Sequence, residues 1–272
     1  LMQNAWNAQW SHNRYRAYYP WTIGGAVWSM YDYNRGCCDN ICYSGLADLF
    51  RLPKFGLLYF RTQMKEGTFT PAGPMTYEVF INSHWLEGSS DTLQVYGNVD
   101  EVKLQLNGRV IARQYPDDKP STSEYVSRPD GGNAENIDFP PFTFFNVNWE
   151  RGELKAIGYK DGKAVAEHVV RTPGAVEAMD ITYFESGVSA SCRDLLIVYV
   201  NLKDLQGTGC FGENNREVKL EVLQGGELRG PATIKAEAGV ASFLVATTDS
   251  PMLVLKAVSG NLETMRKLKL KK

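Results

Sequence analysis

The fold of the first part of the chain is decided by the stretch Ile23-Gly24-Gly25-Ala26-Val27-Trp28-Ser29-Met30-Tyr31-Asp32-Tyr33. This stretch is mostly apolar and is bounded by Pro20 on one side and by Asn34-Arg35-Gly36 on the other. A short continuous apolar run is typical of a strand that is buried on both faces, as in a parallel sheet. Paired glycines inside a strand also let a ligand or another backbone approach closely. We therefore expect Ile23–Trp28 to be a buried strand that ends in a cluster of aromatic and polar side chains.

Two further sequence blocks follow this stretch. The first is Gly45-Leu46-Ala47-Asp48-Leu49-Phe50-Arg51-Leu52-Pro53-Lys54, and the second is Tyr59-Phe60-Arg61-Thr62-Gln63. Together with Gly24 to Asp32, these blocks resemble the end of the catalytic barrel in glycoside hydrolase family 2, the family of β-galactosidases and β-glucuronidases. The resemblance is specific from Gly24 to Gln63 and looser beyond it. It implies that Ile23–Trp28 is the last strand of a (β/α)8 barrel.

Helical patterns flank the expected strand. Trp6, Trp10 and Tyr15 recur at roughly helical spacing within residues 3–17, and Pro20 stops this pattern. A second helical pattern covers residues 48–65, with Pro53 near its first turn. By the resemblance, these are the helices on either side of the last barrel strand. Residues 1–66 are thus expected to be the C-terminal end of a TIM-barrel catalytic domain.

Short alternating strand patterns begin after a linker at residues 67–74, which is rich in glycine and proline. They predict an immunoglobulin-like β-sandwich over residues 67–174, with strands at 76–81, 92–96, 101–106, 109–115, 142–149, 153–159 and 163–171. Asn107-Gly108 and Asp161-Gly162 predict hairpins with type I′ turns. Residues 116–140 predict a long excursion from this sandwich.

A second run of strand patterns predicts another immunoglobulin-like β-sandwich over residues 175–272, with strands at 178–184, 195–202, 217–223, 232–236, 239–246, 252–259 and 263–270. Residues 149–174 also resemble the sandwich after the barrel in the same family, which supports a boundary at Pro173-Gly174. Lysine alternates with leucine in Lys267–Lys272, as in an edge strand that lysines protect from pairing. The predicted fold class is mainly β: a barrel remnant followed by two sandwiches.

Composition argues against two classes of partner. The formal net charge of −2 and the pI of about 6.0 leave no basic footprint for nucleic acid or an anionic membrane. A neutral polymer such as a glycan fits this surface at least as well as a charged ligand. The sequence contains neither a transmembrane run nor a leader pattern at Leu1-Met2-Gln3-Asn4. The family resemblance alone suggests a periplasmic or extracellular location.

The cysteines do not form a recognisable metal motif. Cys37, Cys38 and Cys42 are close in sequence, but no histidine stands nearby and a fourth ligand is missing. We expect no metal and no cofactor. Cys192 and Cys210 are either ordinary thiols or a disulfide across the last domain.

The catalytic chemistry of this family needs two carboxyl groups that flank the scissile bond. By the resemblance, both are glutamates at the ends of the fourth and seventh barrel strands, upstream of residue 1. No residue here matches either one, so we assign no catalytic residue to this chain. Asp48, Arg51 and Lys54 fall in the matched block and are expected to anchor the loop to the rim of the barrel.

The resemblance leaves this chain one wall of the sugar pocket, at the C-terminal ends of the barrel strands. Trp28 matches a tryptophan whose face packs on the sugar, a role that suits a rigid indole. Asp32, Asn34 and Arg35 follow the strand, where they can bind hydroxyls or an anionic sugar. The alternatives are a core tryptophan, loop caps and a salt bridge.

The function predicted from the sequence is that of a C-terminal fragment of a β-galactosidase-like hydrolase of glycosidic bonds in oligo- or polysaccharides. We expect the fragment to be inactive alone, with carbohydrate as the partner of the intact enzyme. The alternative is a non-catalytic sandwich protein that binds glycan or a partner through loops such as residues 116–140. One strand and two helices cannot close a barrel. Residues 1–64 are therefore expected to pack on the first sandwich, to pair with a second copy as a homo-oligomer, or to be poorly ordered.

Overall fold

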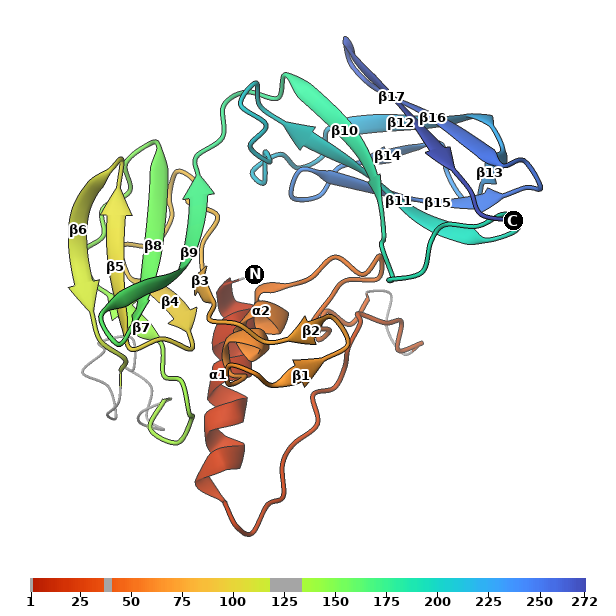
Figure 1. Cartoon of the computed structure of the whole chain (residues 1–272). Helices are drawn as coiled ribbons and strands as arrows, with labels where there is room; N and C mark the ends of the chain where they lie inside the picture. Colours follow the sequence, from red (N-terminus) through yellow and green to blue (C-terminus); the bar gives the residue numbers. More distant parts are fainter. Residues whose placement is uncertain (1, 37–40, 118–133) are drawn as a thin grey trace. The chain divides into compact units, whose positions relative to one another are not determined.

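The computed structural model of the chain describes residues 2–36, 41–117 and 134–272. They form two compact units, one ending at Thr172 and the other starting at Pro173. Each unit contains facing β-sheets, and the first also contains two helices (Figure 1). The prediction of a mainly β fold is confirmed. The boundaries predicted at residues 66 and 174 stay predictions.

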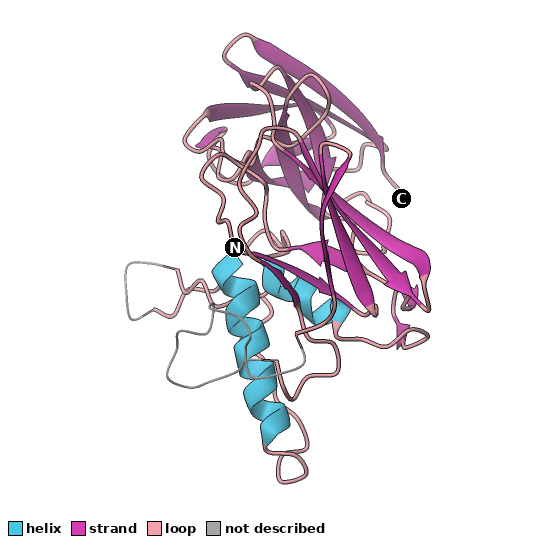
Figure 2. Cartoon of the chain, turned by 90° about the vertical axis from the view of Figure 1, so that its left-hand side faces the viewer, coloured by secondary structure: helices cyan, strands magenta, loops and turns pink. Residues whose placement is uncertain are grey.

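The two helices lie side by side at the start of the first unit (Figure 2). Helix α1 (Met2–Ala17) matches the predicted helix closely, whereas α2 (Phe55–Thr62) is much shorter than the predicted 48–65. Asp48 Oδ1 accepts a hydrogen bond from Leu52 N at 2.8 Å, and Arg51 has a φ of 67° that a helix does not allow. Residues 48–54 are therefore a turn. Neither of these helices is long and apolar enough to cross a membrane.

The strand predicted at Ile23–Trp28 is not formed in this chain. These residues have no strand pairing, and the side chains of Ile23 and Trp28 are 106% and 76% exposed. A parallel strand is stable only between neighbours that bond to both of its edges. The described residues supply no such neighbours, so the prediction is wrong for the chain as it stands here. A short hairpin, β1 (Phe69–Thr70) with β2 (Gly73–Pro74), follows α2.

Two antiparallel sheets make up the rest of the first unit. One has the order β3-β4-β7 and the other β6-β5-β8-β9. Their inner faces share one apolar core around the fully buried Trp85, whose indole N–H donates to Glu150 O at 3.0 Å. The bounds are β3 (Val79–Ile81), β4 (Leu93–Gly97), β5 (Glu101–Leu106), β6 (Arg109–Gln114), β7 (Phe142–Phe144), β8 (Glu153–Lys160) and β9 (Lys163–Arg171).

The hairpin turns follow the sequence prediction. Asn107 and Gly108 have φ values of 49° and 78°, and Asp161 and Gly162 have 49° and 74°, as type I′ turns require. Asn107 also binds the neighbouring 150–153 turn: its Nδ2 donates to Arg151 O at 3.1 Å, and its Oδ1 accepts from Glu153 N at 2.8 Å. A Cβ on Gly152 would lie 1.9 Å from that Oδ1, so only glycine fits there.

The second unit is built from two antiparallel sheets around its own core. Their orders are β10-β11-β15-β13 and β14-β12-β16-β17, so β17 is an edge strand, as its lysines predicted. The bounds are β10 (Ala178–Tyr183), β11 (Leu195–Lys203), β12 (Glu217–Gln224), β13 (Gly226–Leu228), β14 (Thr233–Lys235), β15 (Val240–Thr247), β16 (Met252–Ser259) and β17 (Leu262–Lys269).

The cysteines of the second unit do not pair. Cys192 and Cys210 are both free thiols, so a disulfide across this domain is not formed. Burial raises the pKa of the Cys210 thiol. Cys37 and Cys38 lie outside the described residues.

Helices α1 and α2 dock on the sheet β3-β4-β7 through an aromatic seam (the contact between the helices and this sheet). Phe55 and Phe80 meet edge to face with ring centroids 5.0 Å apart, and Tyr59 meets Tyr96 in the same way at 5.1 Å. Such pairs add to the free energy gained from the buried area. For the helices, the expectation that residues 1–64 pack on the first sandwich is confirmed.

All three histidines of the chain lie at this seam. His12 Nδ1 is 2.9 Å from the Tyr59 hydroxyl, His84 packs on Phe55 at 4.8 Å between centroids, and His168 packs on Phe80 at 5.3 Å. Burial is the largest cause that lowers the pKa of each ring, and it brings the pKa of His84 to about 4. The seam is therefore built around neutral imidazoles.

Candidate functional site

The candidate site is the loop at residues 28–35, whose backbone is bonded to a second loop at residues 42–47. Leu46 N donates to Ser29 O at 3.1 Å, and Ala47 N donates to Met30 O at 2.9 Å. Further along, Asp32 N donates to Ala47 O at 3.0 Å. The backbone that follows Trp28 is therefore fixed residue by residue, without being part of a sheet.

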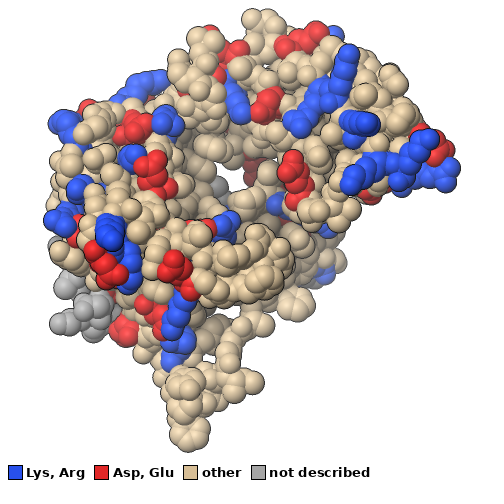
Figure 3. All heavy atoms as spheres, viewed as in Figure 1, with Lys and Arg blue, Asp and Glu red and all other residues tan. Residues whose placement is uncertain are grey.

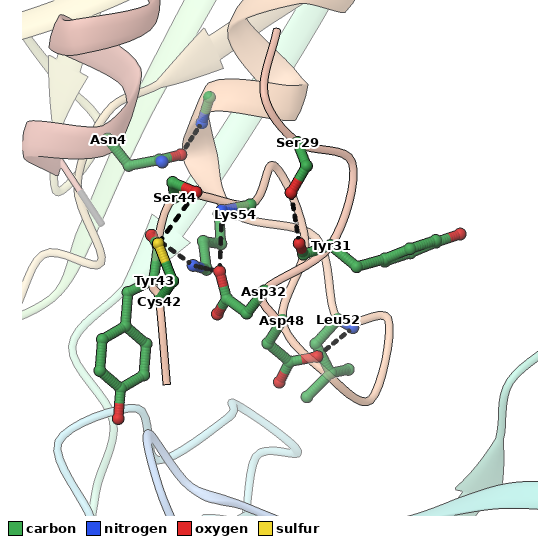
Figure 4. A network of polar contacts seen from close by, with 12 residues as sticks. Asn4, Ser29, Tyr31, Asp32, Cys42, Tyr43, Ser44, Asp48, Leu52 and Lys54 are labelled. Atoms are coloured by element: carbon green, nitrogen blue, oxygen red, sulfur yellow. Dashed lines mark hydrogen bonds and ion pairs between the residues drawn. The ribbon is translucent and has the colours of Figure 1, made fainter. Parts of the chain in front are cut away.

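A buried ion pair ties a third segment to these two loops (Figure 4). Asp32 Oδ1 accepts hydrogen bonds from Lys54 Nζ at 2.6 Å and from Gly45 N at 2.9 Å. The side chains of Asp32 and Lys54 are 3% and 12% exposed. Lys54 Nζ also donates to Tyr43 O at 3.1 Å. One carboxylate and one ammonium thus hold the three segments together.

Gly45 makes this close approach of the loops possible. A Cβ at this position would lie 2.3 Å from Asp32 N and 2.5 Å from Ala47 O, both of which are backbone atoms. Backbone atoms cannot move aside as a side chain can, so only glycine fits between the loops. The support also reaches α1, because Gly56 N at the start of α2 donates to Asn4 Oδ1 at 2.8 Å.

The indole of Trp28 stands on this support and remains open to solvent. Its Nε1–H donates to the Tyr33 hydroxyl at 2.7 Å, and the two rings meet edge to face with centroids 6.1 Å apart. Tyr33 is itself held by its backbone, since Cys42 N donates to Tyr33 O at 2.9 Å. The peptide bond between Trp28 and Ser29 is cis. The hydrogen bond to Tyr33 and the ring contact thus hold the exposed indole in one orientation.

The other residues predicted to bind sugar are placed differently from one another. Asn34 and Arg35 are exposed, and Asn34 Oδ1 accepts a hydrogen bond from Gly36 N at 2.8 Å. Asp32 is buried, and its carboxylate is engaged by Lys54 and Gly45. Trp28, Asn34 and Arg35 therefore share an exposed loop, while Asp32 lies in the support of that loop.

Sequence reasoning placed Lys54 at an anchor of the loop, and the ion pair with Asp32 is such an anchor. It missed Tyr33 and Gly45. Tyr33 ends the aromatic cluster of the apolar stretch, and nothing in the sequence around it predicts a hydrogen bond from its hydroxyl to Trp28. Gly45 opened a matched block, but sequence alone does not reveal which backbone comes close to a glycine.

Charged side chains are few in this loop and its support, and the carboxylates among them are hydrogen-bonded. The two carboxylates of the loop and its support, Asp32 and Asp48, each accept a backbone N–H. Burial is the largest cause that raises the pKa of Asp48. Residues 17–31 contain no charged side chain, and the projection after α1 at the bottom of Figure 3 is uniformly uncharged on the visible face. No cluster that could hold a metal ion occurs among the described residues.

Known proteins match one segment of the chain as a family model and most of the chain as relatives. Residues 88–166 match the family described as Domain of unknown function (DUF4982). A β-galactosidase from Thermoanaerobacter pseudethanolicus is 31% identical over an alignment of 258 residues that covers 88% of this chain and 32% of the relative. A β-glucuronidase from Formosa agariphila is 27% identical over an alignment of 207 residues that covers 74% of this chain and 18% of the relative. The chain thus spans less than a third of the length of these relatives.

The relatives and the three motif blocks agree. The chain belongs to glycoside hydrolase family 2. Solved structures support the fold: a β-glycosidase from Bacteroides vulgatus superposes with a TM-score of 0.74 at 17% identity, covering 97% of this chain and 33% of that one. A β-glucuronidase of family 2 superposes with a TM-score of 0.65 at 21% identity, covering 85% of this chain and 23% of that one. The family resemblance predicted from the sequence is confirmed.

Proposed function

We propose that this family 2 chain is a C-terminal part of a hydrolase of β-glycosidic bonds in oligo- or polysaccharides, and that it supplies one wall of the sugar pocket. In this proposal α1, α2 and the stretch Ile23–Trp28 are the end of a (β/α)8 barrel, and the two pairs of sheets are immunoglobulin-like sandwiches. The carboxyl groups that cleave the bond belong to another part of the protein. The chain alone is inactive.

The observation that carries the proposal is the exposed, oriented indole of Trp28. A tryptophan left 76% exposed offers a broad apolar face with one polar edge, which matches a sugar ring that is apolar on its faces and polar at its rim. Its orientation is fixed by Tyr33 and by the braced backbone. The fixed orientation, more than the exposure, supports a binding role, because the proposed barrel contact leaves Trp21 exposed in this chain as well.

Polar groups beside the indole extend the proposed sugar site. Asn34 and Arg35 are exposed on the same loop and can bind hydroxyls or the carboxylate of an anionic sugar. The β-galactosidase and β-glucuronidase relatives represent these two sugar types. Asp32 was predicted to bind sugar as well. Its buried pair with Lys54 supports an indirect part in the proposed site, through the loop that carries the indole.

The exposed apolar stretch also supports a proposal about assembly. Trp21 and Ile23 are 90% and 106% exposed, and burial of apolar surface yields roughly 25 cal/mol per Å². We expect this stretch to be covered by the upstream barrel in the intact protein. In its absence, two copies of the chain would associate through it.

The test is hydrolysis of nitrophenyl glycosides, β-galactoside and β-glucuronide included, by this chain and by a longer protein that contains it. We expect turnover by the longer protein only. In that protein, Trp28→Ala should lower kcat/KM by about 10-fold or more, while Trp21→Ala should lower it less. Turnover by this chain alone would overturn its inactivity, and a longer protein that hydrolyses no glycoside would overturn the proposal as a whole.

A further inference from the structure

Tyr33 is the one side chain in the described part of the loop whose hydrogen bond reaches the exposed indole. The indole Nε1–H points at its hydroxyl at 2.7 Å, and the two rings are almost perpendicular, at 83°. The two residues are five positions apart and belong to the same loop. The contact therefore closes the loop on itself and leaves Trp28 76% exposed.

The backbone of Tyr33 is fixed independently of the indole. Tyr33 and Cys42 exchange two backbone hydrogen bonds, from Cys42 N at 2.9 Å and from Tyr33 N at 3.3 Å. The preceding residue, Asp32, is tied by its carboxylate to Lys54 and Gly45. A buried charge that keeps its partner holds its geometry, because separating the pair would leave the charge uncompensated. The hydroxyl of Tyr33 is thus presented from a rigid base.

We infer that Tyr33 and the Asp32–Lys54 pair are positioning residues: Tyr33 sets the orientation of the Trp28 indole, and the ion pair sets the place of Tyr33. This inference deepens the proposed function, on which its consequence for sugar binding rests. A free indole on an exposed loop samples several rotamers, and binding a sugar would have to order it. An indole held by the hydroxyl is ordered before the sugar arrives. Tyr33 and Lys54 then act on affinity without touching the sugar.

The first measurement concerns the chain itself and needs no substrate. In a ¹H–¹⁵N NMR spectrum the indole N–H signal of Trp28 is identified by its loss in Trp28→Phe. We expect Tyr33→Phe to move that signal upfield and to speed its exchange with water, because the acceptor is gone. Lys54→Met should move the same signal. The matched control is Tyr115→Phe, a tyrosine just after β6 and outside the loop, which is 61% exposed. This control should leave the signal in place.

The second measurement uses the longer enzyme and a double-mutant cycle. Tyr33→Phe should raise KM by about 3- to 10-fold, the worth of one hydrogen bond, with little change in kcat. In a Trp28→Phe background the same change should have no further effect, because the indole donor is already absent. Tyr115→Phe should leave both constants unchanged. A role of Tyr33 in folding alone would give equal effects in both backgrounds.

The outcomes separate the two ideas. If the Trp28 signal is the same in Tyr33→Phe as in the unaltered chain, the positioning inference is overturned, whatever the enzyme does. If Tyr33→Phe moves the signal and the longer enzyme hydrolyses no glycoside, the positioning geometry stands and the proposed function fails. A signal shift together with non-additive KM effects supports both.

Discussion

Residues 19–28 are followed in the sequence by the described residues 29–36 and 41–54, yet the two segments differ sharply in structure. The first segment is mostly exposed and has no strand pairing, with Trp21 at 90% and Ile23 at 106% exposure. The second is held by backbone bonds between its loops and by the buried pair of Asp32 and Lys54. The comparison shows that a segment is held in place where its hydrogen-bonding and ion-pair partners belong to the same chain. The partners of the second segment are within the chain.

The largest expected effect comes from undocking the helices on which both segments depend. Tyr59 is fully buried in the seam with Tyr96, and Tyr59→Ala would remove the ring and leave a cavity. We expect a loss of about 4 kcal/mol in the free energy of unfolding of the first unit. Urea unfolding followed by circular dichroism measures it. Tyr19→Ala is the control, since that side chain is 75% exposed and should matter little; equal losses in the two variants would contradict the docked seam.

A somewhat smaller effect is expected from breaking the buried pair. Lys54→Met leaves the carboxylate of Asp32 buried without its cation, which should cost about 3 kcal/mol. The double variant Asp32→Asn with Lys54→Met removes both charges and should recover part of that loss. Chemical denaturation of the unaltered chain, Lys54→Met and the double variant gives the comparison. A double variant that is less stable than Lys54→Met would show that the carboxylate, not the pair, matters to the loop.

The seam should also weaken in acid, because it is built around neutral histidines. The pKa of His84 is lowered from 6.5 to about 4 in the folded chain, so the unfolded chain binds the proton first as pH falls. Stability is therefore fully present above pH 6.5 and declines between 6.5 and about 4. His84→Phe keeps a ring against Phe55 and should flatten this decline. A pH series of urea unfolding measures the slope; an unchanged slope in His84→Phe would assign the acid sensitivity to other groups.

The smallest effect on stability is expected in the exposed segment. Trp21→Ser with Ile23→Ser should change the free energy of unfolding of this chain by less than about 0.5 kcal/mol, because both side chains lie in solvent. The same change should reduce self-association, as measured by sedimentation at several concentrations. A large loss of stability in the monomer would mean that the segment has partners within the chain, and would remove the contrast between the two segments.

Local signals explain how much of the fold could be predicted. Strands such as β8, β15 and β17 follow alternation that each segment carries within itself, and the turns at Asn107 and Asp161 are set by residues that accept positive φ. The short strand β13, between the predicted strands at 217–223 and 232–236, was missed. The strand at Ile23–Trp28 failed because its stability depends on neighbours that the described chain does not contain. The start of α2 was missed because Asp48 and Arg51 form a turn inside a helix-like pattern.

The candidate site was predictable only in part, for a related reason. The sequence singled out Trp28, Asn34 and Arg35, which are exposed on one loop. It also singled out Asp32, but not that Lys54, 22 residues later, would bury and neutralise it. Tyr33 gave no signal, because an aromatic residue after an apolar run is typical of a core. The roles of Asp32, Lys54 and Tyr33 depend on contacts between segments, which the sequence of one segment does not predict.

The turn at Asn107-Gly108 has a consequence for how the protein ages. An asparagine followed by glycine is ordinarily prone to deamidation, in which the glycine nitrogen attacks the side-chain carbonyl carbon and releases ammonia. Here Asn107 Nδ2 donates to Glu150 Oε1 at 2.9 Å and to Arg151 O at 3.1 Å, and its Oδ1 accepts from Glu153 N at 2.8 Å. These bonds hold the side-chain amide in place, and cyclisation would have to break them. The folded chain should therefore keep this asparagine intact during storage, while the unfolded chain loses it.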